Sequence, residues 1–245
     1  MRNTVNRIFT STSKGQNQQV ANERNWTAEV NAELKQELVS VVSYPDRCPL
    51  FGDARFHGNC DGRLFLHLVK QYGASSIADP MMGSGTTQDA VNWLNAQSEQ
   101  RIEYWGDDLS RGFDLERDEL PGPFDFIWIH PPYWNIVHYS DDARDLSTAS
   151  TYEEFCLRLT HCLNRCYDEL APNGHLAVLL GDVRRKGKYF APVWDCLRET
   201  GCAIGSPVSV LVKSQHGVRS NRTQYSRLKH PRIMHETCLV FERRD

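Results

Sequence analysis

The stretch Asp79-Pro80-Met81-Met82-Gly83-Ser84-Gly85-Thr86-Thr87 joins a short apolar run to a helical pattern, and it decides the fold. Ser76-Ile77-Ala78, directly before it, is typical of a buried strand, and Gln88 to Leu94 shows the apolar spacing of a helix. Glycines lack a Cβ, so the backbone can turn sharply and approach a ligand closely. The stretch therefore predicts a strand, a glycine turn and a helix, with a ligand site at the turn.

A nucleoside triphosphate is a poor ligand for this turn. A phosphate-binding loop carries Lys directly after its last glycine, whereas Thr86 follows Gly85 here. The turn is also shorter than the GxGxxG turn of dinucleotide-binding folds, and Asp79 precedes it. It suits a ligand without a pyrophosphate, whose amino-acid portion meets the acid and the turn amides.

A second strand is expected within Arg101–Asp108, and it ends in acidic side chains. Asp108 follows the glycine turn by about twenty residues, the spacing at which an acidic side chain accepts hydrogen bonds from ribose hydroxyls in dinucleotide-type folds. Gly112–Leu115 is expected to form a very short third strand.

The near-continuous apolar run Phe124–Ile129 predicts a central parallel strand. It carries His130-Pro131-Pro132-Tyr133 at its carboxyl end. Ligands of open α/β sheets lie beyond the carboxyl ends of the central strands. We therefore expect the glycine turn, Asp108 and this tetrapeptide to share one crevice. The alternative interpretation of His130 is a histidine that merely ends a strand.

The rest of the chain alternates between helical and strand patterns, which predicts an α/β fold with a mostly parallel central sheet and helices on both faces. Helices are expected over residues 26–42, 63–72, 87–97, 152–170 and 192–200, and further strands over 175–180, 206–213 and 236–243. Residues 1–25 are polar and predict a flexible arm, which either touches nucleic acid or is simply disordered. Residues 26–245 are expected to form a single domain.

Composition limits the class of protein. The chain has 245 residues, 40% of them hydrophobic, which suits one domain of ordinary size. Its apolar runs are too short for a transmembrane span, and the first residues lack the apolar core of a signal peptide, so we expect a cytoplasmic protein without membrane contact. The eight cysteines show no CxxC spacing. They predict small buried hydrophobic residues in a reducing compartment and no metal site.

Charge is unevenly distributed along the chain. The net charge is −3, yet the segment from Lys213 to Arg232 carries six cations and no acid. A second cluster comprises Arg184, Arg185, Lys186 and Lys188. Local basic patches on a mildly acidic protein fit a polyanion bound at one face. Solvated loops are the alternative interpretation of both clusters.

Together, the two motifs resemble those of S-adenosylmethionine-dependent DNA amino-methyltransferases. Asp79–Thr87 is similar to their cofactor motif, and His130–Tyr133 to their catalytic motif, whose first position is usually Asp, Asn or Ser. His235–Phe241 resembles their closing segment. The resemblance implies a Rossmann-like methyltransferase fold and S-adenosylmethionine as cofactor. It further implies methyl transfer to the exocyclic amine of a flipped DNA base, with adenine as the first candidate.

The resemblance also implies which residues hold the cofactor. They are Asp79, Pro80, Met81, Gly83, Gly85, Thr86, Asp108 and Asp114. Asp79 and the turn amides would hold the methionine part, Asp108 the ribose, and Asp114 the adenine or its edge.

In the catalytic motif, the side chain at position 130 and the carbonyl of Pro131 would accept the two N–H groups of the target amine. Pro131 and Pro132 make the turn rigid, and Tyr133 would stack on the base with help from Trp134. His130 departs from the usual pattern. Only a neutral imidazole offers an acceptor nitrogen, so activity is expected to fall at acid pH.

Nucleic-acid contacts are expected from the two basic clusters, at Arg184, Lys186, Lys213, Arg219, Arg222, Tyr225 and Arg227. Asp182 either lines the base pocket or belongs to an ordinary turn. We see no separate target-recognition domain, so specificity is expected from loops 134–150 and 213–234, from the amino-terminal arm, or from a second copy in a homodimer. A cognate restriction nuclease is a further candidate partner.

Three alternatives stay open beside DNA adenine methylation. They are amino-methylation of cytosine in DNA, amino-methylation of an RNA base, and a catalytically silent protein that binds cofactor or nucleic acid. Methylation at carbon 5 of cytosine is disfavoured, because by resemblance it needs a nucleophilic Cys in a Pro-Cys pair, and the chain has none.

Overall fold

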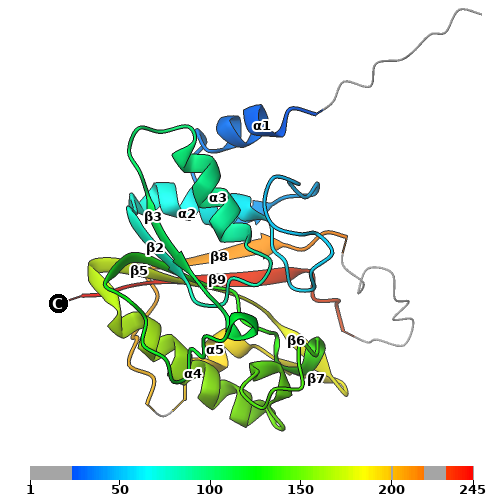
Figure 1. Cartoon of the computed structure of the whole chain (residues 1–245). Helices are drawn as coiled ribbons and strands as arrows, with labels where there is room; N and C mark the ends of the chain where they lie inside the picture. Colours follow the sequence, from blue (N-terminus) through cyan, green and yellow to red (C-terminus); the bar gives the residue numbers. More distant parts are fainter. Residues whose placement is uncertain (1–23, 200, 218–229, 245) are drawn as a thin grey trace, which may run out of the picture.

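Seven strands form one sheet in the part of the chain that the computed structural model describes, residues 24–199, 201–217 and 230–244 (Figure 1). Across the sheet the order is β1-β8-β9-β5-β4-β2-β3. The strands are β1 (Val41–Ser43), β2 (Ser76–Asp79), β3 (Glu103–Gly106), β4 (Phe124–Ile129), β5 (Leu170–Gly181), β8 (Ser209–Ser214) and β9 (His235–Glu242). A separate hairpin pairs β6 (Val183–Arg185) with β7 (Lys188–Phe190).

Every strand of the large sheet is parallel to the others except β9, which runs antiparallel between β5 and β8. The described ranges also contain five helices: α1 (Trp26–Glu33), α2 (Gly62–Tyr72), α3 (Thr86–Asn95), α4 (Tyr152–Asp168) and α5 (Pro192–Cys196). Short 3-10 turns lie at η1 (Leu109–Arg111), η2 (Trp134–Ile136) and η3 (Leu146–Thr148). The structure is a Rossmann-like α/β fold, and the predicted fold class is confirmed.

Side-chain alternation along the strands builds a hydrophobic core on each face of the sheet. In β4, Phe126 and Trp128 belong to the core under α2 and α3, whereas Ile127 and Ile129 belong to the core under α4 (Figure 1). All four side chains are almost fully buried. Burial at both faces explains why this strand is apolar except at Asp125 near its start, and it fixes the position of the residues that follow Ile129.

The helix α4 shows how sequence sets one of these layers. Phe155, Leu159, Cys162 and Cys166 recur every three or four residues and form one buried stripe. Thr151 caps the helix by accepting from the backbone N–H of Glu154 at 3.1 Å. At the opposite face, Gly73 ends α2 in the left-handed conformation, with φ 61°.

Several element boundaries differ from expectation. The helix predicted over 26–42 ends at Glu33, and Val41–Ser43 forms the edge strand β1, because the β-branched valines pair in register with β8. Gly112–Leu115 is not a strand, since Gly112 closes the turn η1 with φ 104°. The hairpin β6–β7 was not predicted. Of the arm predicted over residues 1–25, positions 1–23 lie outside the described residues.

The eight cysteines are free thiols, and all except the half-buried Cys202 are buried, which confirms their interpretation as small core residues. Within the described ranges, no helix combines the length and apolarity that crossing a membrane requires. Nor do three or more His, Cys, Asp or Glu side chains in those ranges gather as metal ligands.

Candidate active site

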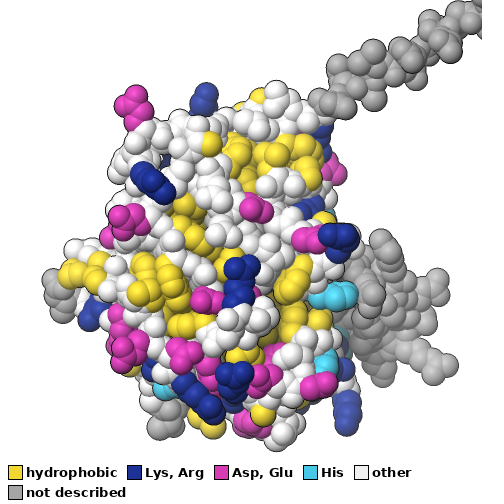
Figure 2. All heavy atoms as spheres, in the orientation of Figure 1, with side chains coloured by type: hydrophobic (Ala, Val, Ile, Leu, Met, Phe, Trp, Pro, Cys, Tyr) yellow, Lys and Arg dark blue, Asp and Glu magenta, His cyan; other side chains and the backbone are white. Residues whose placement is uncertain are grey.

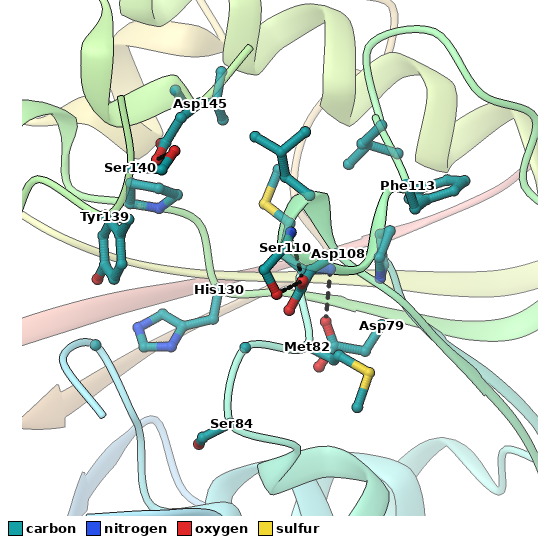
Figure 3. A pocket seen from close by; sticks show the side chains of 18 of the residues that line it. Asp79, Met82, Ser84, Asp108, Ser110, Phe113, His130, Tyr139, Ser140 and Asp145 are labelled. Atoms are coloured by element: carbon teal, nitrogen blue, oxygen red, sulfur yellow. Dashed lines mark hydrogen bonds between the residues drawn. The ribbon is translucent and has the colours of Figure 1, made fainter. Parts of the chain in front are cut away.

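A cavity of about 420 Å³ opens at the carboxyl ends of β2, β3 and β4. Asp79 is the last residue of β2, Asp108 follows β3, and His130 follows β4. All three line the cavity (Figure 3). The cavity therefore brings together the glycine turn, Asp108 and, from the tetrapeptide, His130 and Pro132. Its volume lies in the range of small-molecule sites.

The glycine turn forms the floor of this cavity and leads directly into α3. Gly83 and Gly85 have φ of 49° and 82°, a region that side chains with a Cβ rarely adopt. A Cβ on Gly83 would approach Phe56 to 3.0 Å. The N–H of Met82 donates to the carbonyl of Asp107 at 3.2 Å, which ties the turn to the end of β3. The turn thus presents backbone and the start of α3 to a ligand.

Asp79 is buried in the cavity wall and fixed by two donors. The backbone N–H of Met81 donates to Oδ1 at 3.0 Å, and the Thr87 hydroxyl donates to Oδ2 at 2.6 Å. Burial raises the pKa of Asp79 to about 7, against the opposing effect of these bonds. A cationic group placed beside this carboxyl would restore its charge, so the site is suited to an ammonium.

The other two predicted acids, Asp108 and Asp114, also line the cavity. Asp108 accepts through Oδ1 from the N–H and the hydroxyl of Ser110, at 2.9 and 2.6 Å. Its Oδ2 makes no hydrogen bond to any described residue. Asp114 is buried, and its Oδ2 also lacks a hydrogen bond in the described part, although Arg117 Nε lies 3.5 Å away as an ion pair. Both carboxylates therefore retain acceptor capacity toward a ligand.

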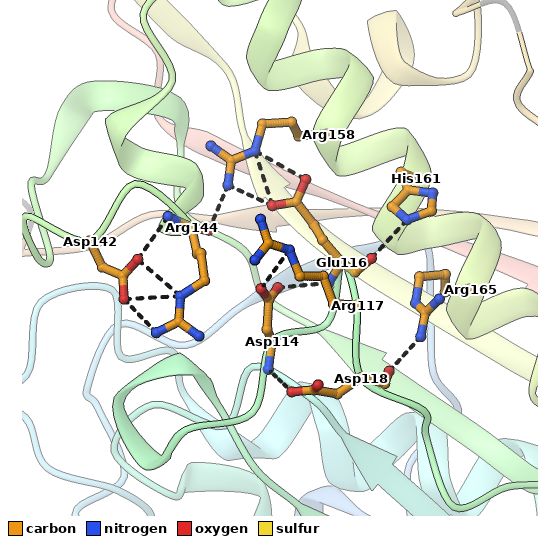
Figure 4. Close-up of polar contacts among 9 residues, drawn as sticks. All are labelled: Asp114, Glu116, Arg117, Asp118, Asp142, Arg144, Arg158, His161 and Arg165. Carbon is orange, nitrogen blue, oxygen red and sulfur yellow. Dashed lines mark hydrogen bonds and ion pairs between the residues drawn. The ribbon is translucent and has the colours of Figure 1, made fainter.

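A network of ion pairs fastens this side of the cavity to α4 (Figure 4). Arg158 of α4 binds Glu116 at 2.5 Å and the carbonyl of Arg144 at 2.6 Å. Arg144 in turn pairs with Asp142 at 2.6 Å. The segments that contain Asp114 and Arg144 are therefore held on the same helix, which gives the cavity a defined wall.

The turn His130–Tyr133 begins a chain of polar contacts that ends at the buried pair Glu236 and Lys213. His130 Nε2 lies 2.9 Å from the Tyr133 hydroxyl, which donates to Glu236 Oε1. Lys213 Nζ binds Glu236 Oε2 at 2.5 Å. Burial lowers the pKa of His130 to about 4, although Glu236 opposes that effect. The imidazole is therefore neutral at neutral pH and can act as an acceptor.

The remaining residues of the motif are arranged around this chain. Pro132 lines the cavity, while Pro131 is buried behind it. The Tyr133 ring lies against Gly181, where an added Cβ would approach Tyr133 Cε2 to 2.5 Å. Trp134 packs edge-on against Tyr152 and Phe190. Neither Trp134 nor Tyr133 belongs to the described cavity wall. Stacking of a base on either ring stays a prediction.

The structure corrects one predicted nucleic-acid contact. Lys213 is 8% exposed and ion-paired with Glu236, so its ammonium is not available to a phosphate. Arg184 and Lys186 lie on the β6–β7 hairpin, Arg184 half-buried and Lys186 exposed. Asp182 lies outside the described cavity wall; its Oδ2 accepts from the Tyr189 hydroxyl and lies 3.3 Å from His235 Nε2. The predictions for Arg219, Arg222, Tyr225 and Arg227 fall outside the described residues.

Two loops contribute residues that sequence reasoning missed. Phe56 and Asn59 come from the loop before α2, and Tyr139 comes from the loop after β4. Phe56 and Tyr139 lie with ring centroids 6.1 Å apart. Asn59 accepts from the Thr86 hydroxyl at 2.5 Å. Neither loop carries a motif; their only signal was a polar composition next to the predicted crevice, with glycines in the first loop alone.

No protein-family model matches the chain, and no curated protein matches it. Solved structures with partial similarity include TrmN from Thermus thermophilus, with 17% identity, TM-score 0.41 and coverage of 75% of this chain and 49% of that one. The N-methyltransferase NodS from Bradyrhizobium japonicum, in complex with S-adenosyl-L-homocysteine, has 12% identity, TM-score 0.40 and coverage of 91% and 100%. The sugar N-methyltransferase KedS8 from Streptoalloteichus has 13% identity and TM-score 0.41, with coverage of 86% of this chain and 99% of that one. The chain spans about half the length of TrmN.

Proposed function

We propose that this protein transfers a methyl group from S-adenosylmethionine to the exocyclic amine of a DNA base, with adenine as the first candidate. One observation carries the proposal. Three neighbouring strands bring Asp79, Asp108 and the His130-Pro131-Pro132 turn to one cavity. A carboxyl that suits an ammonium, a second with a free oxygen and a neutral acceptor side chain match the groups of the cofactor and of an amine substrate.

The residues around the cavity fit the cofactor part by part. Asp79 and the amides of the glycine turn suit the charged amino-acid end, and the free oxygen of Asp108 suits the ribose hydroxyls. Phe113, Leu115 and Leu146 form an apolar wall next to Asp114, which suits adenine. When bound, the cofactor supplies a methyl group on a positively charged sulfur, and the protein supplies placement.

The catalytic turn would act by orienting the amine. An exocyclic amine conjugates its lone pair into the base ring and is a poor nucleophile. If His130 and the Pro131 carbonyl each accept one N–H, the nitrogen becomes pyramidal and its lone pair points at the methyl group. Transfer would be a direct displacement, in which the amine nitrogen takes the methyl group from the sulfonium as the S–C bond breaks and then releases one proton to solvent. No covalent bond to the enzyme is required.

A basic and aromatic hairpin next to the catalytic turn supports a nucleic-acid substrate. Arg185 of β6 donates to the side chain of Asn135 at 2.8 Å and to its carbonyl at 2.6 Å, which docks the hairpin on η2. The guanidinium of Arg184 lies 5.3 Å from the Tyr189 ring. Figure 2 shows cations and anions interspersed on one face, so phosphate contacts there would be local rather than spread over a broad basic surface.

Methyl transfer can be measured directly. The protein is incubated with methyl-labelled S-adenosylmethionine and either unmethylated DNA or RNA, and the nucleic acid is digested to nucleosides. We expect label in N6-methyladenine from DNA. Label in N4-methylcytosine would change the base, and label from RNA alone would change the substrate. Cofactor binding without transfer to either nucleic acid would overturn the proposed activity.

The hairpin makes a separate prediction. The double variant Arg184→Ala/Lys186→Ala should bind duplex DNA more weakly, because each phosphate contact releases counterions. The slope of log affinity against log salt should fall by about 2 if both side chains contact phosphates. The matched control Lys35→Ala/Arg101→Ala removes two exposed cations elsewhere and should keep the wild-type slope. An unchanged slope in the hairpin variant would exclude these contacts.

A further inference from the structure

A shielded chain of polar side chains connects the cavity with the antiparallel strand β9. It runs from His130 through the Tyr133 hydroxyl to Glu236, and ends at Lys213. Lys213 and Glu236 lie opposite each other in the β8–β9 register and are 8% and 7% exposed. A charged pair so deep in the protein, linked by hydrogen bonds to a cavity residue, is costly to bury and needs an explanation beyond packing.

The charge of Glu236 determines the direction of the first hydrogen bond. Burial alone would raise the pKa of Glu236, but Lys213, His130 and the hydrogen bonds together lower it to about 2. Glu236 is therefore a carboxylate and can only accept. Burial and the neighbouring carboxylate raise the pKa of Tyr133 well above its ordinary value, so Tyr133 remains a phenol with one proton. That proton is donated to Glu236.

The direction of the second hydrogen bond then follows. Because the only Tyr133 proton is donated to Glu236, the phenol oxygen can only accept from His130 Nε2, 2.9 Å away. Nε2 must carry a proton. A neutral imidazole carries a single proton, so Nδ1 keeps a lone pair. Nδ1 makes no hydrogen bond to any residue within the described ranges, and His130 lines the cavity (Figure 3).

We propose that Glu236 and Lys213 are positioning residues that act through Tyr133 to hold His130 in the Nε2–H tautomer, so that Nδ1 is the acceptor for the substrate amine. The amine itself rests on the proposed function; the tautomer does not. In the other tautomer, Nδ1–H would face the N–H groups of the amine as a second donor. An Asp or Asn at this position offers an acceptor oxygen in any case, whereas a histidine needs its proton placed.

The experiment joins a spectroscopic and a kinetic measurement on the full chain. The ¹⁵N chemical shifts of the His130 ring are recorded for wild type, Tyr133→Phe and the double variant Lys213→Met/Glu236→Gln, and His130→Asn assigns the signal. Wild type should show one protonated Nε2 and one bare Nδ1. Both variants should show a mixture of tautomers, because nothing then fixes the proton. The double variant removes both buried charges at once, which leaves neither of them unpaired.

Kinetics test whether the tautomer matters for transfer. The kcat of Tyr133→Phe should fall about 10- to 100-fold, the value of one hydrogen bond to a charged network, while the Kd of S-adenosyl-L-homocysteine stays unchanged. Tyr72→Phe and Glu242→Gln are matched controls. Tyr72 bonds Ser209 at 3.2 Å, and Glu242 ends β9 far from the cavity. Both should keep the wild-type tautomer and kcat.

Each outcome is decisive for one claim. A wild-type ring protonated at Nδ1 overturns the inference even if methyl transfer is observed. An unchanged tautomer in both variants also overturns it. A wild-type Nε2–H ring with no transfer to DNA or RNA leaves the tautomer assignment standing and removes the proposed function together with the catalytic purpose of the chain. Altered tautomers with unchanged kcat contradict the positioning role.

Discussion

Replacing His130 with alanine is expected to lower kcat by roughly 10²- to 10⁴-fold, the range typical for a positioned acid–base side chain. The variant loses the acceptor nitrogen at the cavity but keeps Asp79, Asp108 and the glycine turn. The Kd of S-adenosyl-L-homocysteine should therefore stay within about twofold of wild type, since a hydrogen bond not made by the cofactor has no effect on its affinity. Single-turnover transfer and calorimetric binding measure the two quantities separately.

Two further variants sharpen this test. His130→Asn restores an acceptor oxygen and should recover part of the lost rate. His138→Ala removes an exposed imidazole from the neighbouring loop, where it pairs with Asp141, and should behave as wild type. Equal losses in His130→Ala and His138→Ala would point to general damage of the loop. Full activity in His130→Ala would leave His130 as a residue that merely ends a strand.

Replacing Asp79 with asparagine is expected to have opposite effects on binding and stability. Loss of the charged partner should raise the Kd of S-adenosyl-L-homocysteine about 10- to 100-fold at pH 8. Without ligand, the variant should be more stable than wild type at pH 8 by up to about 4 kcal/mol, the value of a shift from 3.8 to about 7 in the pKa of a buried carboxyl.

The gain in stability expected for Asp79→Asn follows from the raised pKa of Asp79 in the folded protein. Below pH 4 the Asp79 carboxyl is protonated in both the folded and the unfolded chain. Between pH 4 and 7 the folded protein holds the proton more tightly, so the free energy of unfolding falls as pH rises through this window. Denaturant titrations of wild type and Asp79→Asn at pH 5 and pH 8 measure the difference, which should be larger at pH 8.

Asp125→Asn provides a control of opposite sign. Asp125 lies near the amino end of β4, away from the cavity. Burial acts to raise its pKa, but hydrogen bonds from Ser75 and Ser76 outweigh that effect and lower it. Its replacement should destabilise the protein at pH 8 and leave cofactor affinity unchanged. If Asp79→Asn is no more stable than wild type at pH 8, or binds cofactor as tightly, Asp79 does not hold the charged end of the ligand.

The pH dependence of activity distinguishes the effect of Asp79 from that of His130. The cofactor affinity should weaken as pH falls below about 7, because Asp79 becomes protonated, whereas kcat should stay level until His130 is protonated near pH 4. Sequence reasoning expected a loss of activity at acid pH from His130 alone. The structure moves that loss to a lower pH, since burial holds the imidazole neutral, and assigns the earlier effect to the carboxyl.

Local sequence predicted the parts of the site that lie at strand ends. The boundaries of β4 match the apolar run Phe124–Ile129 because every residue of the strand except the half-buried Asp125 is buried on one face or the other. Asp79 and Gly85 were found because their turn needs special backbone geometry. Tertiary pairing determined the rest. Val41–Ser43 became a strand only because β8 lies beside it, and no local pattern records that neighbour.

Lys213 shows how composition misleads. It opens a cationic segment, which favoured a phosphate contact, yet it shares the inward side of β8 with Leu211. In a strand every second residue points to the same face, so the spacing of Lys213 from Leu211 indicated that its side chain points inward. The partner could not have been predicted, because Glu236 is 23 residues away and meets Lys213 only through the β8–β9 register. Lysine and glutamate usually lie at the surface, but pairing between β8 and β9 buries Lys213 and Glu236 at the end of the polar chain that starts at His130.

The position of β9 also bears on synthesis. This strand is inserted between β5 and β8, although it follows both in the chain. A ribosome-bound chain that ends before His235 leaves those two strands unjoined and supplies no carboxylate for Tyr133. The cavity walls at Asp79 and Asp108 belong to segments made far earlier. A nascent chain would therefore contain Asp79 and Asp108 well before the carboxylate that accepts from Tyr133, so under the proposed function methyl transfer would await the synthesis of β9.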